Sequence, residues 1–210
     1  RQAQAQGFFK HESTAVTIPQ RKGEPIIVDT DEHPRASTTL EGLNKLKGVV
    51  KADGTVTAGN ASGINDGAAA LLIASDEAIQ QYQLKPRAKI IAATTVGIEP
   101  RIMGFAPAPA IKKLLKQANL SIEQMDVIEL NEAFAAQALA VTRDLGLADD
   151  TTQVNPNGGA IAIGHPLGAS GARLVTTALN QLEQTGGTYA LCSMCIGVGQ
   201  GIAVLIERCD

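Results

Sequence analysis

The sequence predicts an α/β protein in which a mixed, mainly parallel sheet is covered by helices. Residues 86–210 alternate between strand-like and helix-like segments in the order βαβαβαββ. Such alternation is typical of parallel sheets with helices on their faces. The chain has 210 residues, 44% of them hydrophobic, which is enough for one or two units with a core. Residues 1–85 lack the alternation, so we expect them to form a separate part.

The second part supplies most of the regular elements. Apolar runs predict strands at residues 89–96, 126–130, 188–194 and 202–208, and a brief strand ending at Val154. Helices are expected from Pro109, which suits a first helical position, and over residues 132–145 and 169–184. The Gly186-Gly187 pair ends the last of these helices.

The first part has fewer and shorter elements. Residues 14–18 and 25–29 predict two strands. Thr38 and Glu41 have the spacing of a capping box, which predicts a helix to about residue 47. The unbroken apolar run 68–74 predicts a strand buried on both faces, although its pattern also fits a buried helix. Ser75-Asp76-Glu77 is typical of a helix start, and that helix should reach about residue 83.

Composition excludes several classes of function. The net charge is −3 and no long run of Lys or Arg occurs, so a nucleic-acid partner is not expected. No apolar stretch is long enough to span a bilayer, and the N-terminus does not resemble a signal peptide. Three cysteines in a chain of this size fit a reducing, cytoplasmic environment. The abrupt beginning of the sequence leads us to expect that it is a piece of a longer protein.

Cys192 and Cys195 form a Cys-x-x-Cys pair with three possible interpretations. A metal site needs four ligands, and no second Cys-x-x-Cys or paired His motif occurs in the sequence. A redox pair is expected at a helix N-terminus rather than at a strand end. Two small buried core residues are the default interpretation. Cys195 departs from this default because it lies at a strand end, against glycines whose N–H groups can approach a ligand closely. The run 197–201 resembles a dinucleotide loop, but a strand follows it instead of a helix, which excludes that fold.

Asn131 and His165 also follow strand-like segments. His165 precedes a helix and is suited to binding an anionic oxygen, but a structural role in a tight turn is equally compatible with the pattern. Asn131 is also suited to capping the next helix. His11 and His33 read as surface or loop residues. The strand-end positions predict that a thiol, an imidazole and an amide meet at one site with Cys–His chemistry and an oxyanion site.

Four segments together resemble the thiolase family, and the resemblance runs through essentially the whole chain. They are residues 59–68 (GNASGINDGA), 131–135 (NEAFA), 158–166 (GGAIAIGHP) and 195–199 (CIGVG). The resemblance implies a thiolase-like fold in which residues 1–85 are the tail of the N-terminal half, including part of its substrate-binding loop region, and residues 86–210 are the C-terminal domain.

The resemblance also implies roles for individual residues. Cys195 matches the general acid/base at the substrate α-carbon, His165 and Asn131 match one oxyanion hole, and the Gly197 N–H matches a donor of the second. His165 would also help to activate the nucleophile. Ser62 and Arg35 fall where the family contacts coenzyme A, at the pantetheine and the phosphates. Met103 and Phe134 match the lining of the acyl pocket. No metal and no permanently bound cofactor are implied, since coenzyme A and acyl-CoA are the substrates.

Two departures from the family pattern are informative. The family's nucleophilic cysteine lies in an N-terminal segment, and no cysteine precedes Cys192 here. We therefore expect the chain to be inactive alone and to pair with that missing half in a dimer or tetramer. Val198 and Gln200 replace residues common in other thiolases.

These two residues make the segment look more like 3-oxoadipyl-CoA thiolases of bacterial aromatic degradation. Such enzymes cleave 3-oxoadipyl-CoA to succinyl-CoA and acetyl-CoA. A biosynthetic acetyl-CoA C-acetyltransferase is the alternative. A non-catalytic module that binds coenzyme A or a partner subunit is the alternative from another class.

Overall fold

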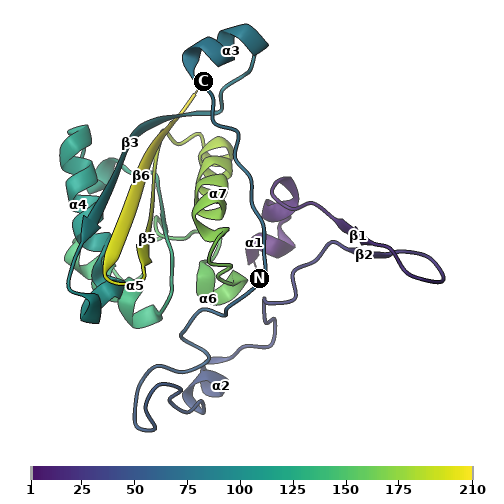
Figure 1. Cartoon of the computed structure of the whole chain (residues 1–210). Coiled ribbons are helices and arrows are strands. Elements are labelled where there is room, and N and C mark those ends of the chain that lie inside the picture. Colours follow the sequence, from purple (N-terminus) through teal and green to yellow (C-terminus); the bar gives the residue numbers. More distant parts are fainter. Residues whose placement is uncertain (1, 210) are drawn as a thin grey trace.

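The computed structural model describes residues 2–209, and its regular elements fall into two parts (Figure 1). The first part contains α1 (Gln2–Ala5), η1 (Phe8–His11), β1 (Val16–Ile18), β2 (Ile26–Val28), α2 (Leu40–Asn44) and α3 (Asp76–Tyr82). The second part contains β3 (Ala88–Gly97), η2 (Pro100–Phe105), α4 (Pro107–Ala118), η3 (Ile122–Gln124), β4 (Val127–Leu130), α5 (Ala135–Asp144), α6 (Ala160–Ile163), α7 (Ser170–Thr185), β5 (Tyr189–Ile196) and β6 (Gln200–Arg208).

The second part forms a four-stranded mixed sheet in the order β3-β6-β5-β4, which confirms the predicted α/β fold. Antiparallel pairing is more common than we expected. Only β4 and β5 pair in parallel, while β6 is antiparallel to both β3 and β5. The reason is local, because a three-residue turn joins β5 to β6 and a turn this short can connect only antiparallel strands. The brief strand expected near Val154 is a single parallel bridge to Ile128.

Helices cover both faces of this sheet (Figure 1). On one face α4 packs against β3 and β6, in a core that includes the fully buried Ile111 and Leu114. On the other face α7 packs against β4 and β5 through Leu174 and Leu182. These apolar side chains repeat at helical spacing, so each helix turns one stripe towards the sheet. The polar residues that follow the strands are thus held at the edge of a well-packed layer.

Three helix starts differ from the sequence prediction. Pro107, not Pro109, is the first residue of α4. The α5 helix begins at Ala135 rather than at residue 132, because Phe134 is extended and bridges to Ala61. Thr39, not Thr38, caps α2 by accepting a hydrogen bond from the Gly42 N–H. In each case the first turn shifts by one to three residues, as is usual for helix ends.

The first part contributes little to the core. The antiparallel strands β1 and β2 form as predicted, but every residue in them is exposed, and they extend away from the sheet as a hairpin (Figure 1). The predicted helix α3 is also confirmed, with the Ser75 side chain as its cap. Both buried clusters consist of residues from the second part.

The prediction of a buried strand at residues 68–74 is wrong in this chain. The segment has no regular structure, and Leu72 and Ile73 are 82% and 67% exposed. A buried strand needs neighbours for its backbone N–H and C=O groups, and no described strand pairs with this segment. The run is therefore an apolar surface that residues 2–209 leave uncovered.

No helix among residues 2–209 combines the length and the apolar character needed to cross a membrane.

Candidate active site

Asn131 and His165 meet in the folded chain although 34 residues separate them in sequence. Asn131 follows β4 directly and is fully buried, and His165 is 8% exposed. The Asn131 Nδ2 and His165 Nε2 atoms lie 3.2 Å apart. The backbone N–H of Asn131 donates to the Ser193 carbonyl at 2.9 Å, which extends the parallel pairing of β4 and β5. This contact places the amide–imidazole pair beside β5, two residues before Cys195.

The loop before His165 is held by a segment from the first part of the chain. The His165 N–H donates to the Gly63 carbonyl at 3.2 Å and to Asn65 Oδ1 at 3.1 Å. Gly164 precedes it with a φ of +98°, and a Cβ at this position would lie 2.6 Å from Asn65 Oδ1. The tight packing therefore requires glycine at residue 164, for both its backbone angle and its lack of a side chain.

His33 supports this loop, a role that its sequence setting did not indicate. Its Nε2 lies 3.2 Å from the Ile161 carbonyl, and its Nδ1 lies 3.3 Å from Asn65 Nδ2. Since a carbonyl oxygen only accepts, Nε2 carries the ring hydrogen of His33 and Nδ1 accepts from the amide. Asn65 thus bridges the His33 side chain and the His165 backbone. No local pattern could have revealed this, because His33 and Ile161 are 128 residues apart.

The predicted coenzyme A and acyl-pocket residues approach the same region. The Ser62 N–H donates to the Ala133 carbonyl at 3.0 Å, and Ser62 is half-buried. Phe134 is half-buried next to Ala133 and pairs with Ala61 across a β-bridge. Met103 is also half-buried, in η2, which packs against α5 just beyond Phe134. The backbone contacts thus tie the Ser62 segment to the residues that follow Asn131.

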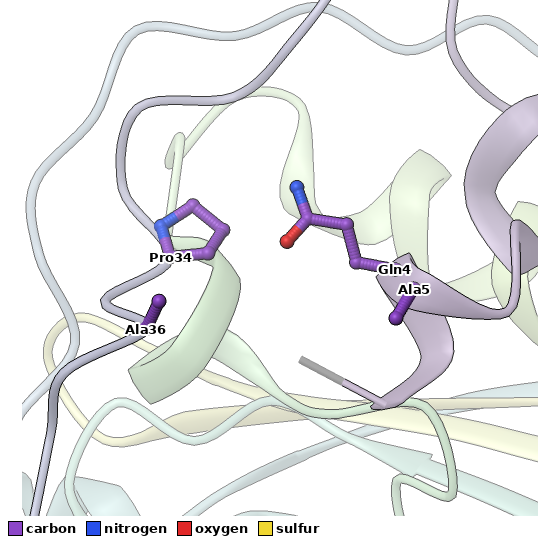
Figure 2. A pocket seen from close by; sticks show the side chains of 4 residues that line it. All are labelled: Gln4, Ala5, Pro34 and Ala36. Atoms are coloured by element: carbon purple, nitrogen blue, oxygen red, sulfur yellow. The ribbon is translucent and has the colours of Figure 1, made fainter.

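Arg35 has no described side-chain contact with the other predicted site residues. It is exposed, in an extended segment of the first part. Its neighbours in the chain, Pro34 and Ala36, border a hollow together with Gln4 and Ala5 of α1 (Figure 2).

The two cysteines near the end of β5 lie in different surroundings. Cys192 packs in the cluster beneath α7, and burial raises the pKa of its thiol strongly. Cys195 lies three residues further along the strand, so alternation turns it to the other face. It is 6% exposed, and burial raises the pKa of this thiol too. Cys195 is consequently a protonated thiol at neutral pH, and its conjugate thiolate is a strong base.

The turn after Cys195 has an unusual backbone. Gly197 has open space where a Cβ would lie. At Gly199, which has a φ of +84°, a Cβ would lie only 2.3 Å from the Ile98 carbonyl oxygen. Val198 between them has a φ of +61° and is 78% exposed. A β-branched residue rarely adopts this conformation, so Val198 is strained. The sequence pattern singled out Val198 as a departure from the family, but it did not indicate the strain.

Arg173, whose charge acts on His165, contacts a buried carboxyl group. Arg173 Nη1 donates to Glu129 Oε2 at 2.9 Å, and Glu129 is fully buried. Burial raises the pKa of Glu129 to about 8, although Arg173 opposes the rise. Burial and then the charge of Arg173 lower the pKa of His165, so its imidazole is neutral at neutral pH. Neither residue was predicted as part of the site.

Replacing Glu129 by Gln should change how stability depends on pH. The folded chain binds the Glu129 proton more tightly than the unfolded chain does. Protonated Glu129 therefore contributes most to the free energy of unfolding below about pH 4.5. Its contribution falls as the pH rises to about 8, by at most about 1.4 kcal/mol per pH unit. Urea unfolding at about pH 5 and pH 8 should show the wild type losing more stability than Glu129→Gln over this interval.

Glu183→Gln provides the matched control for this measurement. Glu183 is paired with Arg87 near the surface, and that hydrogen bond lowers its pKa. Glu183 therefore stays ionised from pH 5 to pH 8. The free energy of unfolding of Glu183→Gln should change with pH by the same amount as that of the wild type. If the stability of Glu129→Gln and that of the wild type changed equally between pH 5 and pH 8, the raised pKa of Glu129 would be contradicted.

The fold and this geometry define an α/β domain that carries a buried amide–imidazole pair beside a strand ending in a thiol. The family description "Thiolase, C-terminal domain" matches residues 84–208, and "Thiolase, N-terminal domain" matches residues 1–77. The chain belongs to the thiolase family.

Three known proteins illustrate this similarity. The chain is 85% identical over 206 residues to "Beta-ketoadipyl-CoA thiolase" of Acinetobacter baylyi, a match that covers 98% of this chain and 51% of the relative. The Bacillus anthracis acetyl-CoA acetyltransferase structure matches 99% of the chain and 52% of its own length, with a TM-score of 0.94 and 42% identity.

Human mitochondrial 3-ketoacyl-CoA thiolase in complex with CoA matches 99% of the chain and 51% of its own length, with a TM-score of 0.87 and 44% identity. The chain thus spans about half the length of the relatives it matches.

Proposed function

We propose that this chain is one half of a thiolase that cleaves a 3-oxoacyl-CoA with the thiol of coenzyme A. The observation that carries the proposal is the contact between Asn131 and His165, held beside the strand that ends in Cys195. An amide, an imidazole and a thiol at one edge of a sheet supply the groups that carbon–carbon cleavage of a 3-oxo thioester requires.

In the first step, a cysteine from a segment outside this sequence attacks the 3-oxo carbon. His165 accepts the thiol proton on Nε2, since its lowered pKa keeps the ring neutral and able to act as a base. The protonated Nε2 then donates to the oxyanion, and Asn131 holds a water that donates to the same oxygen. The carbon–carbon bond breaks as the oxyanion collapses, and the acyl group stays on the cysteine.

Cys195 handles the proton at the α-carbon. Its buried thiol is protonated at neutral pH, and it gives that proton to the carbanion that leaves as acetyl-CoA. The resulting thiolate takes the proton of an incoming coenzyme A, whose sulfur attacks the acyl-enzyme. The bond from the acyl group to the cysteine breaks, the leaving cysteine thiolate takes back the proton from His165 Nε2, and the shortened acyl-CoA is released. The Gly197 N–H stabilises the charge on the thioester oxygen of the acetyl unit. The raised pKa of Cys195 suits both of its steps.

The remaining predicted residues would bind the substrate. Ser62, held against the Ala133 backbone, would contact the pantetheine, and the exposed Arg35 would contact the phosphates of coenzyme A. Met103 and Phe134 would line the acyl pocket. The CoA complex of the human mitochondrial relative supports coenzyme A as the shared ligand.

We assign 3-oxoadipyl-CoA as the substrate, with succinyl-CoA and acetyl-CoA as products. The name of the 85% identical Acinetobacter relative supports this choice. The Bacillus anthracis neighbour is named an acetyl-CoA acetyltransferase, so acetoacetyl-CoA is the competing substrate. Turnover of the two compounds in competition decides between them, and a preference for acetoacetyl-CoA would contradict our assignment.

The proposal includes a partner for the exposed apolar segment. Residues 1–85 would be the tail of the N-terminal half and residues 86–210 the C-terminal domain, working in a cytoplasmic homo-oligomer. The uncovered run 68–74 and the exposed hairpin support association with the rest of such an enzyme. We expect light scattering of the 210-residue chain to show association, and a monodisperse monomer would count against this.

The intact mass of the chain after incubation with 3-oxoadipyl-CoA tests the assignment of the nucleophile. We expect no covalent acyl adduct, since the attacking cysteine lies outside this sequence. The second arm uses a single polypeptide in which the half of the Acinetobacter relative that this chain does not span precedes residues 1–210. This protein, called here the joined enzyme, should form the adduct and turn over 3-oxoadipyl-CoA.

An adduct on the 210-residue chain alone would mean that one of its own cysteines is the nucleophile. An inactive but folded joined enzyme would overturn the proposed function.

A further inference from the structure

His165 contacts a hydroxyl group that the sequence motifs did not indicate as part of the site. Its Nδ1 lies 2.6 Å from Oγ of Ser170, the first residue of α7. His165 and Ser170 are 8% and 1% exposed. A hydrogen bond between buried groups is strengthened by the low local dielectric, so this contact constrains the imidazole firmly.

The direction of this hydrogen bond follows from the other partner of Ser170. The Ser170 hydroxyl donates to the Pro166 carbonyl at 3.0 Å. A serine hydroxyl has a single hydrogen, so its oxygen meets His165 as an acceptor and Nδ1 carries the ring hydrogen. In a neutral imidazole the other nitrogen, Nε2, then carries no hydrogen and is an acceptor. Asn131 Nδ2, a donor, meets that nitrogen at 3.2 Å, so every donor in this chain of contacts faces an acceptor.

We infer that Ser170 is a positioning residue that holds His165 in the tautomer with hydrogen on Nδ1 and so leaves Nε2 without a hydrogen, as the nitrogen that can accept a proton. The catalytic consequence of this inference rests on the proposed function, whereas the tautomer does not. When the attacking thiol gives its proton to Nε2, the ring becomes an imidazolium whose Nδ1–H still donates to Ser170. The opposite tautomer would present an N–H at Nε2 and could not take the proton.

The surroundings of the ring support this assignment. Burial, followed by the charge of Arg173 one turn after Ser170 on α7, lowers the pKa of His165. The ring is thus neutral at neutral pH, and a neutral ring is the form in which the tautomer decides what each nitrogen can do. The first turns of α7 therefore supply both the group that neutral His165 donates to and a charge that keeps it neutral.

Nitrogen-15 NMR of the histidine side chains tests the tautomer directly in the 210-residue chain. The sequence has only three histidines, so assignment by substitution is simple. His165 should show a protonated Nδ1 and a bare Nε2. His33 is an internal reference with the opposite tautomer, because its Nε2 donates to the Ile161 carbonyl.

Variants separate the effect of Ser170 from general disturbance of the core. Ser170→Ala should populate the Nε2–H tautomer of His165, and Ser170→Thr should retain the wild-type tautomer. Ser193→Ala is the matched control. Ser193 is also buried, at 2% exposed, but its hydroxyl donates to the Ile202 carbonyl and does not contact His165. That variant should leave the His165 signals unchanged.

In the joined enzyme, Ser170→Ala should lower kcat roughly tenfold to a hundredfold with little change in KM, since the base is misoriented and not lost. Hydrogen on Nε2 in the wild type, or an unchanged tautomer in Ser170→Ala, would overturn the inference. A wild-type His165 with hydrogen on Nδ1 in a folded but inactive joined enzyme would leave the tautomer assignment standing and refute the proposed function instead.

Discussion

Cys195→Ser should reduce turnover of 3-oxoadipyl-CoA by the joined enzyme by about 10²–10⁴-fold, the range expected for loss of a general acid/base. A serine hydroxyl is a far weaker acid than a thiol, so it protonates the leaving carbanion poorly and does not form the anion that activates coenzyme A. Burial has already raised the pKa of Cys195, and a hydroxyl in the same place would be harder still to ionise.

The readout that isolates this role is exchange of the acetyl-CoA α-hydrogens with deuterated solvent, followed by mass spectrometry. The wild type should catalyse the exchange and Cys195→Ser should not. Cys192→Ala is the control, because Cys192 is buried against the helix on the other face of the strand. It should cost about 1 kcal/mol of stability and leave turnover within about twofold. Unchanged turnover in Cys195→Ser would refute the assignment of the acid/base.

His165→Ala should lower turnover by about 10³–10⁴-fold, because the substitution removes both the base that activates the nucleophile and a donor to the oxyanion. It also leaves Asn131 Nδ2 and the Ser170 hydroxyl oxygen without their imidazole partner. The loss should fall mainly on kcat, since the imidazole acts on the reacting atoms and not on the remote part of coenzyme A.

The rate at which the covalent acyl-enzyme forms distinguishes His165→Ala from Cys195→Ser. Rapid quenching and intact-mass measurement should show that His165→Ala forms the acyl-enzyme far more slowly than the wild type. His11→Ala is the control, because His11 is exposed and has no described contact with Asn131, His165 or Ser170. Acyl-enzyme formation at the wild-type rate in His165→Ala would show that another group activates the nucleophile.

Local patterns were sufficient to predict most of the second part of the chain. Each apolar stripe of α4 and α7, and each apolar run of β3 to β6, is a pattern within one short segment. Such a pattern can therefore be recognised without knowing which other segments pack against it. The same logic failed for residues 68–74. Their apolar run suits a buried strand, yet a strand forms only where another strand satisfies its backbone, and none among the described residues does.

The candidate site divides in the same way. By itself the sequence determined which side chains stand at strand ends, and so indicated Asn131, His165 and Cys195, because a strand end is a local feature. Only the tertiary structure decided that Asn131 and His165 touch, that His33 and Asn65 support the loop, and that Ser170 orders the imidazole. Contacts such as His33 with Ile161 join residues far apart in the chain, and side-chain hydrogen-bond direction depends on every neighbour at once. Neither these long-range contacts nor the directions of the hydrogen bonds can be predicted from the spacing of residues along one segment.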